Sequence, residues 1–291
     1  MPVEINPRRR RKAQESMKET VIKSRDNPLL KRARAVRERK LEGLIFIEGV
    51  RLCEEALGAS LAIEDVLCTE RLASDERGAS LLGALRPVCE RITFLSDQVF
   101  ASVSDTKTPQ GIICIAQRPR TGSELLVASD GRVPLIVVMH RVNNPANAGA
   151  ILRAAEAAGA TAAIATGGST DLFSPKALRG AMGSSFRLPL WTGAQFWEII
   201  EWCAGRGISS VCADVRSGRA HTEIDWTVPR ALIVGAEASG LEQTEVAAAD
   251  ETLRIPMRAP VDSLNVAVAS AVILYEAARQ RSESAKKPAP D

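Results

Sequence analysis

Short apolar runs alternate with amphipathic segments through most of the chain. In the second half, four runs have the length and composition of buried strands, and apolar residues recur at helical spacing between and after them. The predicted strands span residues 135–139, 162–166, 209–213 and 231–234, the predicted helices span 148–158, 195–205 and 265–279, and the segment up to residue 183 is expected to be irregular. Strands that alternate with helices predict a mostly parallel sheet covered on both faces, so this half is expected to be an α/β domain.

The first half predicts a smaller α/β domain. Leu30, Ala33, Val36 and Leu41 recur at helical spacing among Lys and Arg, which predicts a short amphipathic helix with a basic outer face. Strands are predicted at residues 44–47, 63–69 and 110–116, a helix at 49–58, and a linker with one short helical piece at 118–134. The expected boundaries are a basic disordered arm at 1–20, this domain at 21–118, and a polar tail at 282–291.

Positive charge is concentrated at one end of the chain. The 291 residues include 38 Lys and Arg against 35 Asp and Glu, a formal net charge of +3. Residues 1–40 hold 14 of the basic and 5 of the acidic residues, a net +9, so the remainder holds 24 and 30, a net −6. A basic arm on an acidic body favours a polyanionic partner, while a solubilising tail or a localisation signal is the alternative. The basic cluster of the arm is Arg8, Arg9, Arg10, Arg11 and Lys12.

Several function classes find no support in the composition. The six Cys form no C-x-x-C pair and the chain has two His, so neither a metal site nor a disulfide framework is predicted. No apolar run reaches the length of a membrane span, and no apolar segment follows the basic N-terminus as in a signal peptide. We expect no metal, no membrane contact and a cytoplasmic location.

One candidate turn precedes the predicted helix at 148–158. Asn147 is suited to cap that helix, and Arg153 follows within it. Side chains tilt toward the helix N-terminus, so Arg153 is expected to reach back to the turn at 143–147, where it and free N–H groups would suit a phosphate. The alternative is a capped helix with one solvated arginine.

A second turn follows the strand at 231–234. Gly235 and Gly240 have the G-x-x-x-x-G spacing, but Leu241 and Glu242 follow where a P-loop requires Lys and Ser or Thr. What remains is a glycine-flanked turn that carries one carboxylate, Glu237, which is either paired in a cleft or an exposed turn acid.

A third turn places Ser263 and Asn265 at the start of the last helix, where both are also ordinary capping residues. The helix is expected to pack through one apolar stripe. The stripe consists of Leu264, Val268, Ala271, Val272 and Tyr275.

Together and in this order, these turns resemble the SpoU-type (TrmH-like) RNA 2′-O-ribose methyltransferases of the SPOUT superfamily, over residues 132–281. The matching blocks are residues 147–153, 174–179 with 186–189, 235–241, and 255–257 with 263–266. Ala238 and Ala259 stand where glycine is common in that family. The resemblance implies a parallel sheet with a deep trefoil knot, S-adenosylmethionine bound in the knot, and a homodimer. Residues 23–117 are similar to the small ribosomal-protein-like domain that binds the substrate RNA in many relatives.

The resemblance also implies residue roles. The implied catalytic residues are Asn147, Arg153, Glu237, Ser263 and Asn265. The implied cofactor-binding residues are Gly235, Ala236, Gly240, Ile255, Met257 and Leu264. The RNA-binding candidates are the arm cluster with Lys31, Arg32, Lys176 and Arg179. The resemblance implies for Arg153 the role often assigned in this family, which is to accept the proton of the 2′-hydroxyl. A guanidinium is effectively always protonated, so we expect Arg153 instead to bind the adjacent phosphate and stabilise the alkoxide.

The function expected from the resemblance is S-adenosylmethionine-dependent methyl transfer to a ribose 2′-hydroxyl of structured RNA, with ribosomal RNA favoured. The alternatives are a tRNA 2′-O-methyltransferase, a base methyltransferase, and a non-catalytic RNA-binding or ribosome-assembly protein.

Overall fold

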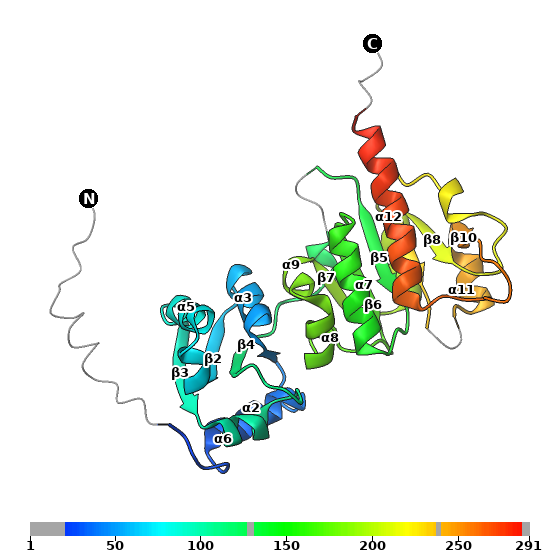
Figure 1. Cartoon of the computed structure of the whole chain (residues 1–291). Helices are drawn as coiled ribbons and strands as arrows, with labels where there is room; N and C mark the ends of the chain where they lie inside the picture. Colours follow the sequence, from blue (N-terminus) through cyan, green and yellow to red (C-terminus); the bar gives the residue numbers. More distant parts are fainter. Residues whose placement is uncertain (1–20, 127–130, 237–239, 287–291) are drawn as a thin grey trace.

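A computed structural model describes residues 21–126, 131–236 and 240–286. They form two α/β domains in chain order, joined by the segment after residue 117 (Figure 1). The predicted arm at 1–20 and Glu237 lie outside the described residues.

The N-terminal domain is a four-stranded sheet with helices on both faces. Its strands are β1 (Leu44–Glu48), β2 (Ile63–Thr69), β3 (Cys89–Leu95) and β4 (Ile112–Gln117), in the order β1-β4-β2-β3. Its helices are α2 (Pro28–Arg37), α3 (Val50–Gly58), α4 (Glu70–Ala73), α5 (Glu76–Leu85) and α6 (Asp97–Val103). Helices α2 and α6 cover one face, where Leu30, Phe46 and Phe100 pack together, and α3 and α5 cover the other (Figure 1).

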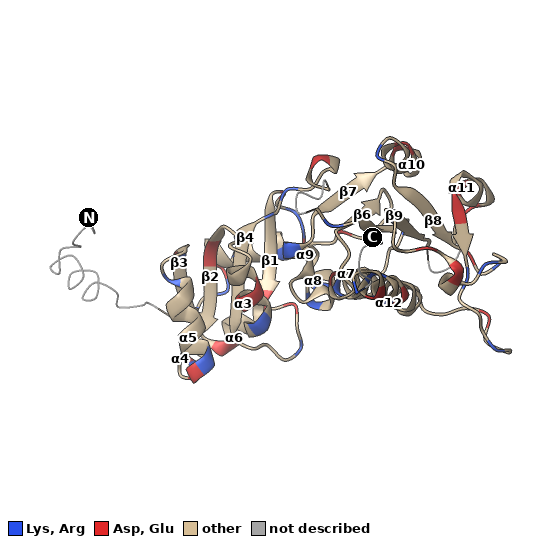
Figure 2. Ribbon diagram, turned by 90° about the horizontal axis from the view of Figure 1, so that it is seen from above, with Lys and Arg blue, Asp and Glu red and all other residues tan. Residues whose placement is uncertain are grey.

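The C-terminal domain is a six-stranded, all-parallel sheet in the order β10-β8-β9-β5-β6-β7. The strands are β5 (Leu135–Met139), β6 (Ala162–Thr166), β7 (Leu190–Ala194), β8 (Ser209–Ala213), β9 (Arg230–Val234) and β10 (Glu251–Leu253). The helices are α7 (Pro145–Ala157), α8 (Pro175–Ala181), α9 (Ser184–Arg187), α10 (Phe196–Ala204), α11 (Gln243–Ala248) and α12 (Val266–Ser284), with 3-10 turns η1 (Ser123–Leu125) and η2 (His221–Glu223). Seen from above, α7 and α12 lie on one side of the sheet and α10 and α11 on the other (Figure 2).

All seven predicted strands are present, because buried strands are short continuous apolar runs. Strands β3, β7 and β10 and helices α4, α5, α6, α9 and α11 were not predicted, and the segment expected to be irregular contains α8. Two details of helix ends were also predicted wrongly. Helix α7 begins at Pro145 with Asn144, not Asn147, as its N-cap, since Asn144 Oδ1 accepts from Ala146 N at 2.9 Å. Leu41 lies beyond the end of α2.

Helix α12 does not pack through the predicted stripe. Val268, Val272 and Tyr275 are 51%, 37% and 56% exposed, and Leu264 is exposed as well. The face turned to the sheet carries Ser270, Ile273, Leu274 and Ala277. The helix has apolar residues on two faces, and periodicity alone does not say which of them meets the sheet.

The two domains share one continuous apolar core. The cluster that contains Ile45 and Ile47 of β1 also contains Phe173 and Leu178 of the C-terminal domain. Charged pairs cross the same joint: Arg118 with Asp171, Arg179 with Asp105, and Arg187 with Glu55. None of the helices in the described part of the chain is both long and apolar enough to cross a membrane.

Candidate active site

A cavity of about 720 Å³ lies at the carboxyl ends of β8, β9 and β10. Ligands of open parallel sheets bind at this edge, because the strands end there in turns with free backbone groups. All six residues expected to bind the cofactor line the cavity, together with Asn147, Ser263 and Asn265. Residues far apart in sequence are thus gathered on one site, although their roles remain predictions.

The turn after β9 leaves room for glycine alone at residue 235. A Cβ atom on Gly235 would lie 2.6 Å from the carbonyl carbon of Gly240 and 2.9 Å from Leu241 N, both backbone atoms. Gly240 N donates to Ala236 O at 2.9 Å and closes the turn, and Gly240 itself has φ +63°. At Gly235 and Gly240 the backbone itself therefore borders the cavity.

Asn265 connects the third turn to the first. Its Oδ1 accepts from Ala267 N at 3.0 Å and Val268 N at 3.3 Å, which caps α12. Its Nδ2 donates to Asn147 Oδ1 at 3.2 Å. Capping and a role in the site are therefore not exclusive: the cap fixes the Asn265 side chain, and that side chain orients Asn147. Ser263 is exposed, with its hydroxyl 3.4 Å from Asp262 Oδ1.

Arg153 does not line the cavity of its own chain. It lies six residues beyond Asn147, about 9 Å further along the α7 axis, and its side chain is exposed. The expectation that it reaches back to the turn at 143–147 is not met within one chain. Six residues are nearly two turns of helix, and the backward tilt of the Arg153 side chain is too short to span that distance along the axis.

The cavity also contains charged residues that the sequence patterns did not single out. Asp214, Arg216 and Arg254 line it beside the ends of β8 and β10. Arg216 Nε donates to Asp214 Oδ1 at 3.0 Å. Burial alone would raise the pKa of Asp214, but hydrogen bonds from Arg216 outweigh it and the pKa lies below its usual value. Asp214 is therefore an ionised acceptor at the cavity wall, and its position just after a strand was the available signal.

A buried polar cluster anchors the segment that follows the Gly235–Gly240 turn. His140 Nε2 lies 2.9 Å from Glu245 Oε1, and Arg141 Nη2 donates to both Glu245 oxygens at 2.8 Å. His140 and Glu245 are 4% and 7% exposed. Burial lowers the pKa of His140. The cluster ties the start of α11 to the end of β5 and so fixes the segment that follows Gly240.

The RNA-binding candidates among the described residues differ in availability. Lys176 is exposed, and Lys31 is 4.0 Å from Asp26. Arg32 pairs with Glu64 and Asp65, and Arg179 pairs with Asp105 at 2.8 Å across the domain joint. Internal pairs compete with RNA phosphates for these two guanidinium groups, so Lys176 is the more available candidate. Within residues 21–126, 131–236 and 240–286, no group of three or more His, Cys, Asp or Glu is arranged to hold a metal ion.

Comparisons with known proteins agree with this geometry. A family model described as SpoU rRNA Methylase family matches residues 134–275, and one described as MRM3-like substrate binding domain matches residues 27–114. The 23S rRNA (guanosine(2553)-2′-O)-methyltransferase RlmP of Bacillus subtilis (strain 168) is 31% identical over 248 residues, which cover 84% of this chain and 92% of that protein. The chain belongs to the SpoU rRNA methylase family.

Solved structures related to this SpoU protein share both of its domains. An RNA 2′-O ribose methyltransferase is 32% identical with a TM-score of 0.79, covering 90% of this chain and 100% of the other. The SpoU methyltransferase AviRb from Streptomyces viridochromogenes, solved with AdoMet, is 27% identical with a TM-score of 0.79, covering 88% and 98%. The predicted family and the predicted two-domain α/β fold are thus confirmed.

Proposed function

We propose that this SpoU protein transfers a methyl group from S-adenosylmethionine to a ribose 2′-hydroxyl of RNA, with ribosomal RNA as the substrate. The observation that carries the proposal is the single cavity that gathers the Gly235 turn, the 255–257 segment, and the Asn147–Asn265 pair. The relatives are named as 23S rRNA 2′-O-methyltransferases, and AviRb was solved with AdoMet.

The residues present suit S-adenosylmethionine. Gly235 and Gly240 have no side chains, so backbone donors and acceptors face a ligand at these positions, and Ile255, Met257 and Leu264 supply an apolar wall. When bound, the cofactor supplies an electrophilic methyl group. That methyl bonds to the ribose 2′-oxygen, its bond to sulfur breaks to leave S-adenosylhomocysteine, and the 2′-hydroxyl proton leaves to phosphate or water. Asn147 and Asn265 would position the ribose, and Arg153 would stabilise the developing alkoxide.

We infer a homodimer from the exposed apolar face of α12. Val268, Val272 and Tyr275 form an exposed stripe on α12. Helix α12 lies beside α7, the helix that carries Arg153 (Figure 1). Packing of two such faces buries apolar surface and presents Arg153 to a second copy of the chain. Because Arg153 is outside its own cavity, we propose that it completes the site of the partner subunit.

Mixed dimers test this arrangement directly. Arg153→Ala and Asn265→Ala are each expected to be inactive alone. Coexpressed with different tags, they should form mixed dimers that each hold one intact site of two, so the purified doubly tagged fraction should recover about half of wild-type activity. Activity of the doubly tagged fraction is the measurement, and Arg153→Ala coexpressed with itself is the control. A mixed dimer as inactive as its parents would place Arg153 in its own subunit's site or reject the dimer.

The basic arm is proposed to contact RNA phosphates. Replacing Arg8, Arg9, Arg10, Arg11 and Lys12 with Gln should flatten the dependence of log Kd on log salt by about 0.7 to 0.9 for each phosphate that the arm no longer neutralises. The measurement is RNA binding across a salt series by filter retention or anisotropy. An unchanged slope would assign the arm to solubility or localisation.

Two further properties are proposed with the function. The trefoil knot is supported by the family relationship and by the way residues of the segments 213–216, 234–236, 240–241 and 253–269 border one cavity. A cytoplasmic location is supported by the proposed ribosomal RNA substrate and by six free cysteines.

The decisive experiment uses tritiated S-adenosylmethionine, the full chain, and ribosomal RNA or tRNA that lacks modifications, followed by nucleoside analysis. Label in a 2′-O-methylnucleoside of ribosomal RNA is expected. Label on a base would move the reaction to the base-methyltransferase alternative, and label in tRNA alone would change the substrate. RNA binding without label, beside a working control enzyme, would favour the non-catalytic alternative.

A further inference from the structure

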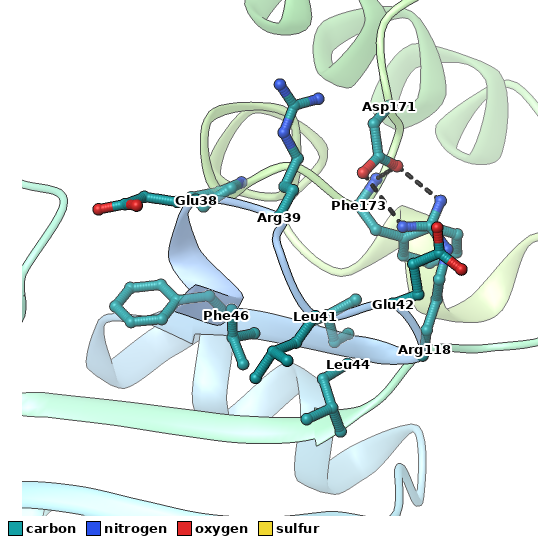
Figure 3. A pocket seen from close by; sticks show the side chains of 13 residues that line it. Glu38, Arg39, Leu41, Glu42, Leu44, Phe46, Arg118, Asp171 and Phe173 are labelled. Carbon is teal, nitrogen blue, oxygen red and sulfur yellow. Dashed lines mark hydrogen bonds and ion pairs between the residues drawn. The ribbon is translucent and has the colours of Figure 1, made fainter. Parts of the chain in front are cut away.

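A second cavity, of about 600 Å³, lies at the joint between the two domains. Figure 3 shows Arg39, Leu41 and Leu44 of the N-terminal domain on its wall, with Asp171 and Phe173 of the C-terminal domain opposite. An occupant would therefore touch both the substrate-binding domain and the methyltransferase domain.

The walls of this joint cavity are held in place by charged pairs. Arg118 Nη2 donates to Asp171 Oδ1 at 2.7 Å and its Nη1 to Oδ2 at 3.1 Å, while the same guanidinium lies 4.6 Å from the centre of the Phe173 ring. Burial would raise the pKa of Asp171, but hydrogen bonds from Arg118 and the Phe173 N–H outweigh it and lower that pKa. The pair is thus ionised, and with the Arg179–Asp105 pair it fixes the joint before any ligand binds.

Arg39 is the arginine of this wall that makes no ion pair among the described residues, although its charge helps to lower the pKa of Asp171. No hydrogen bond or ion pair of its guanidinium occurs among the described residues, and the dashed lines of Figure 3 join Asp171 to Arg118 without reaching Arg39. Its backbone has φ +60°, the left-handed conformation that ends α2, where Lys40 N donates to Ala35 O at 2.8 Å.

The carboxylates around Arg39 are largely neutralised. Asp171 pairs with Arg118, and Glu38 pairs with Lys40 at 2.7 Å. The remaining acid of the wall is Glu42, which is exposed. The adjoining helix α2 is strongly basic. Beside Arg39, Leu41 is 38% exposed and Leu44 is half-buried, so an apolar surface adjoins the free cation. A cation next to an apolar surface suits a nucleotide, which has a phosphate and a flat base.

The joint cavity and the active site occupy the same edge of the six-stranded sheet. Asp171 belongs to the segment after β6, and Thr170 N in that segment donates to Val142 O at 2.9 Å. Val142 immediately precedes the turn at 143–147 that leads to Asn147. An RNA strand lying along this edge would pass from the joint cavity to the proposed methylation site without crossing the body of the protein.

We propose that the joint cavity binds one nucleotide of the substrate RNA outside the methylated position. Arg39 donates hydrogen bonds to the phosphate of this nucleotide, and the base of the nucleotide packs on Leu41 and Leu44. This inference rests on the proposed function and adds a contact that sets where along the RNA the target ribose lies.

The test compares full-length wild type, Arg39→Gln and Arg51→Gln. Arg51 is an exposed arginine on α3, which covers the opposite face of the N-terminal sheet from α2, so its substitution matches the charge change away from the cavity. For Arg39→Gln, the KM for RNA is expected to rise about tenfold or more, and the salt slope of RNA binding to flatten by about 0.7 to 0.9. The Kd for S-adenosylmethionine and the melting temperature should stay at wild-type values, and Arg39→Lys should recover part of the affinity.

A second variant tests the apolar wall without a charge change. Leu41→Trp places a large side chain at the cavity mouth and is expected to raise the KM for RNA while leaving cofactor binding unchanged. Wild-type RNA affinity and salt slope in Arg39→Gln, or losses equal to those of Arg51→Gln, would overturn this inference and leave the proposed function intact. Failure of wild type to bind or methylate any RNA would instead remove the proposed function itself.

Discussion

Replacing Arg153 with lysine is expected to lower methyl transfer by about two to three orders of magnitude although the positive charge is kept. The planar guanidinium can donate two parallel hydrogen bonds to a phosphate and hold that geometry beside the developing alkoxide, whereas an ammonium is a compact point charge on a flexible stem. Because Arg153 is exposed and makes no hydrogen bond or ion pair among the described residues, the substitution should leave folding intact. The measurement is single-turnover methylation at saturating S-adenosylmethionine and RNA.

The matched control is Arg206→Lys. Arg206 is also exposed, but it lies at the end of α10 on the opposite side of the sheet and stacks 4.4 Å from the Trp202 ring centre. It should retain wild-type turnover. If Arg153→Lys turned over as fast as wild type, charge alone would suffice and the two-point clamp would be rejected.

Replacing Gly235 with alanine is expected to weaken S-adenosylmethionine binding by about a hundredfold or more. The added Cβ would lie 2.6 Å from the carbonyl carbon of Gly240 and 2.9 Å from Leu241 N. These are backbone atoms, so relief requires the turn itself to move, and overpacking of this kind costs about 1 to 3 kcal/mol before any weakened hydrogen bond to the ligand is added. Calorimetric titration with S-adenosylmethionine or S-adenosylhomocysteine measures the change.

Gly240→Ala in the same turn separates a steric effect from a conformational one. A Cβ there meets nothing within 4 Å, but φ is +63°. The expected loss is therefore only the cost of the left-handed conformation, about 1 to 2 kcal/mol. Circular dichroism of both variants controls for folding. Equal affinities for Gly235→Ala and wild type would show that the turn does not hold the cofactor as proposed.

The positions of the strands and of the three polar turns were determined locally and could be read from the sequence. A buried strand is a short apolar run, as in Ile63–Thr69 and Leu135–Met139. The turn that follows such a strand needs glycine, proline or a capping residue, and the glycines at 235 and 240 therefore mark a turn. Strands that are short or partly exposed, such as β10 and β3, have no such pattern and were missed. The ordered blocks were also enough to indicate the SpoU family.

Only the tertiary structure decided which side chains meet. The apolar stripe of α12 faces outward because the opposite face of that helix packs on the sheet. Arg153 lies outside the cavity of its own chain because it is about 9 Å beyond Asn147 along α7. Arg179 and Arg32 are engaged by carboxylates 74 and 33 positions away in the chain, whereas Arg39 has no ion-pair partner among the described residues. Such pairings depend on distances between segments that are remote in sequence. Periodicity and motif spacing describe only residues within a few turns of one another, so they do not predict these pairings.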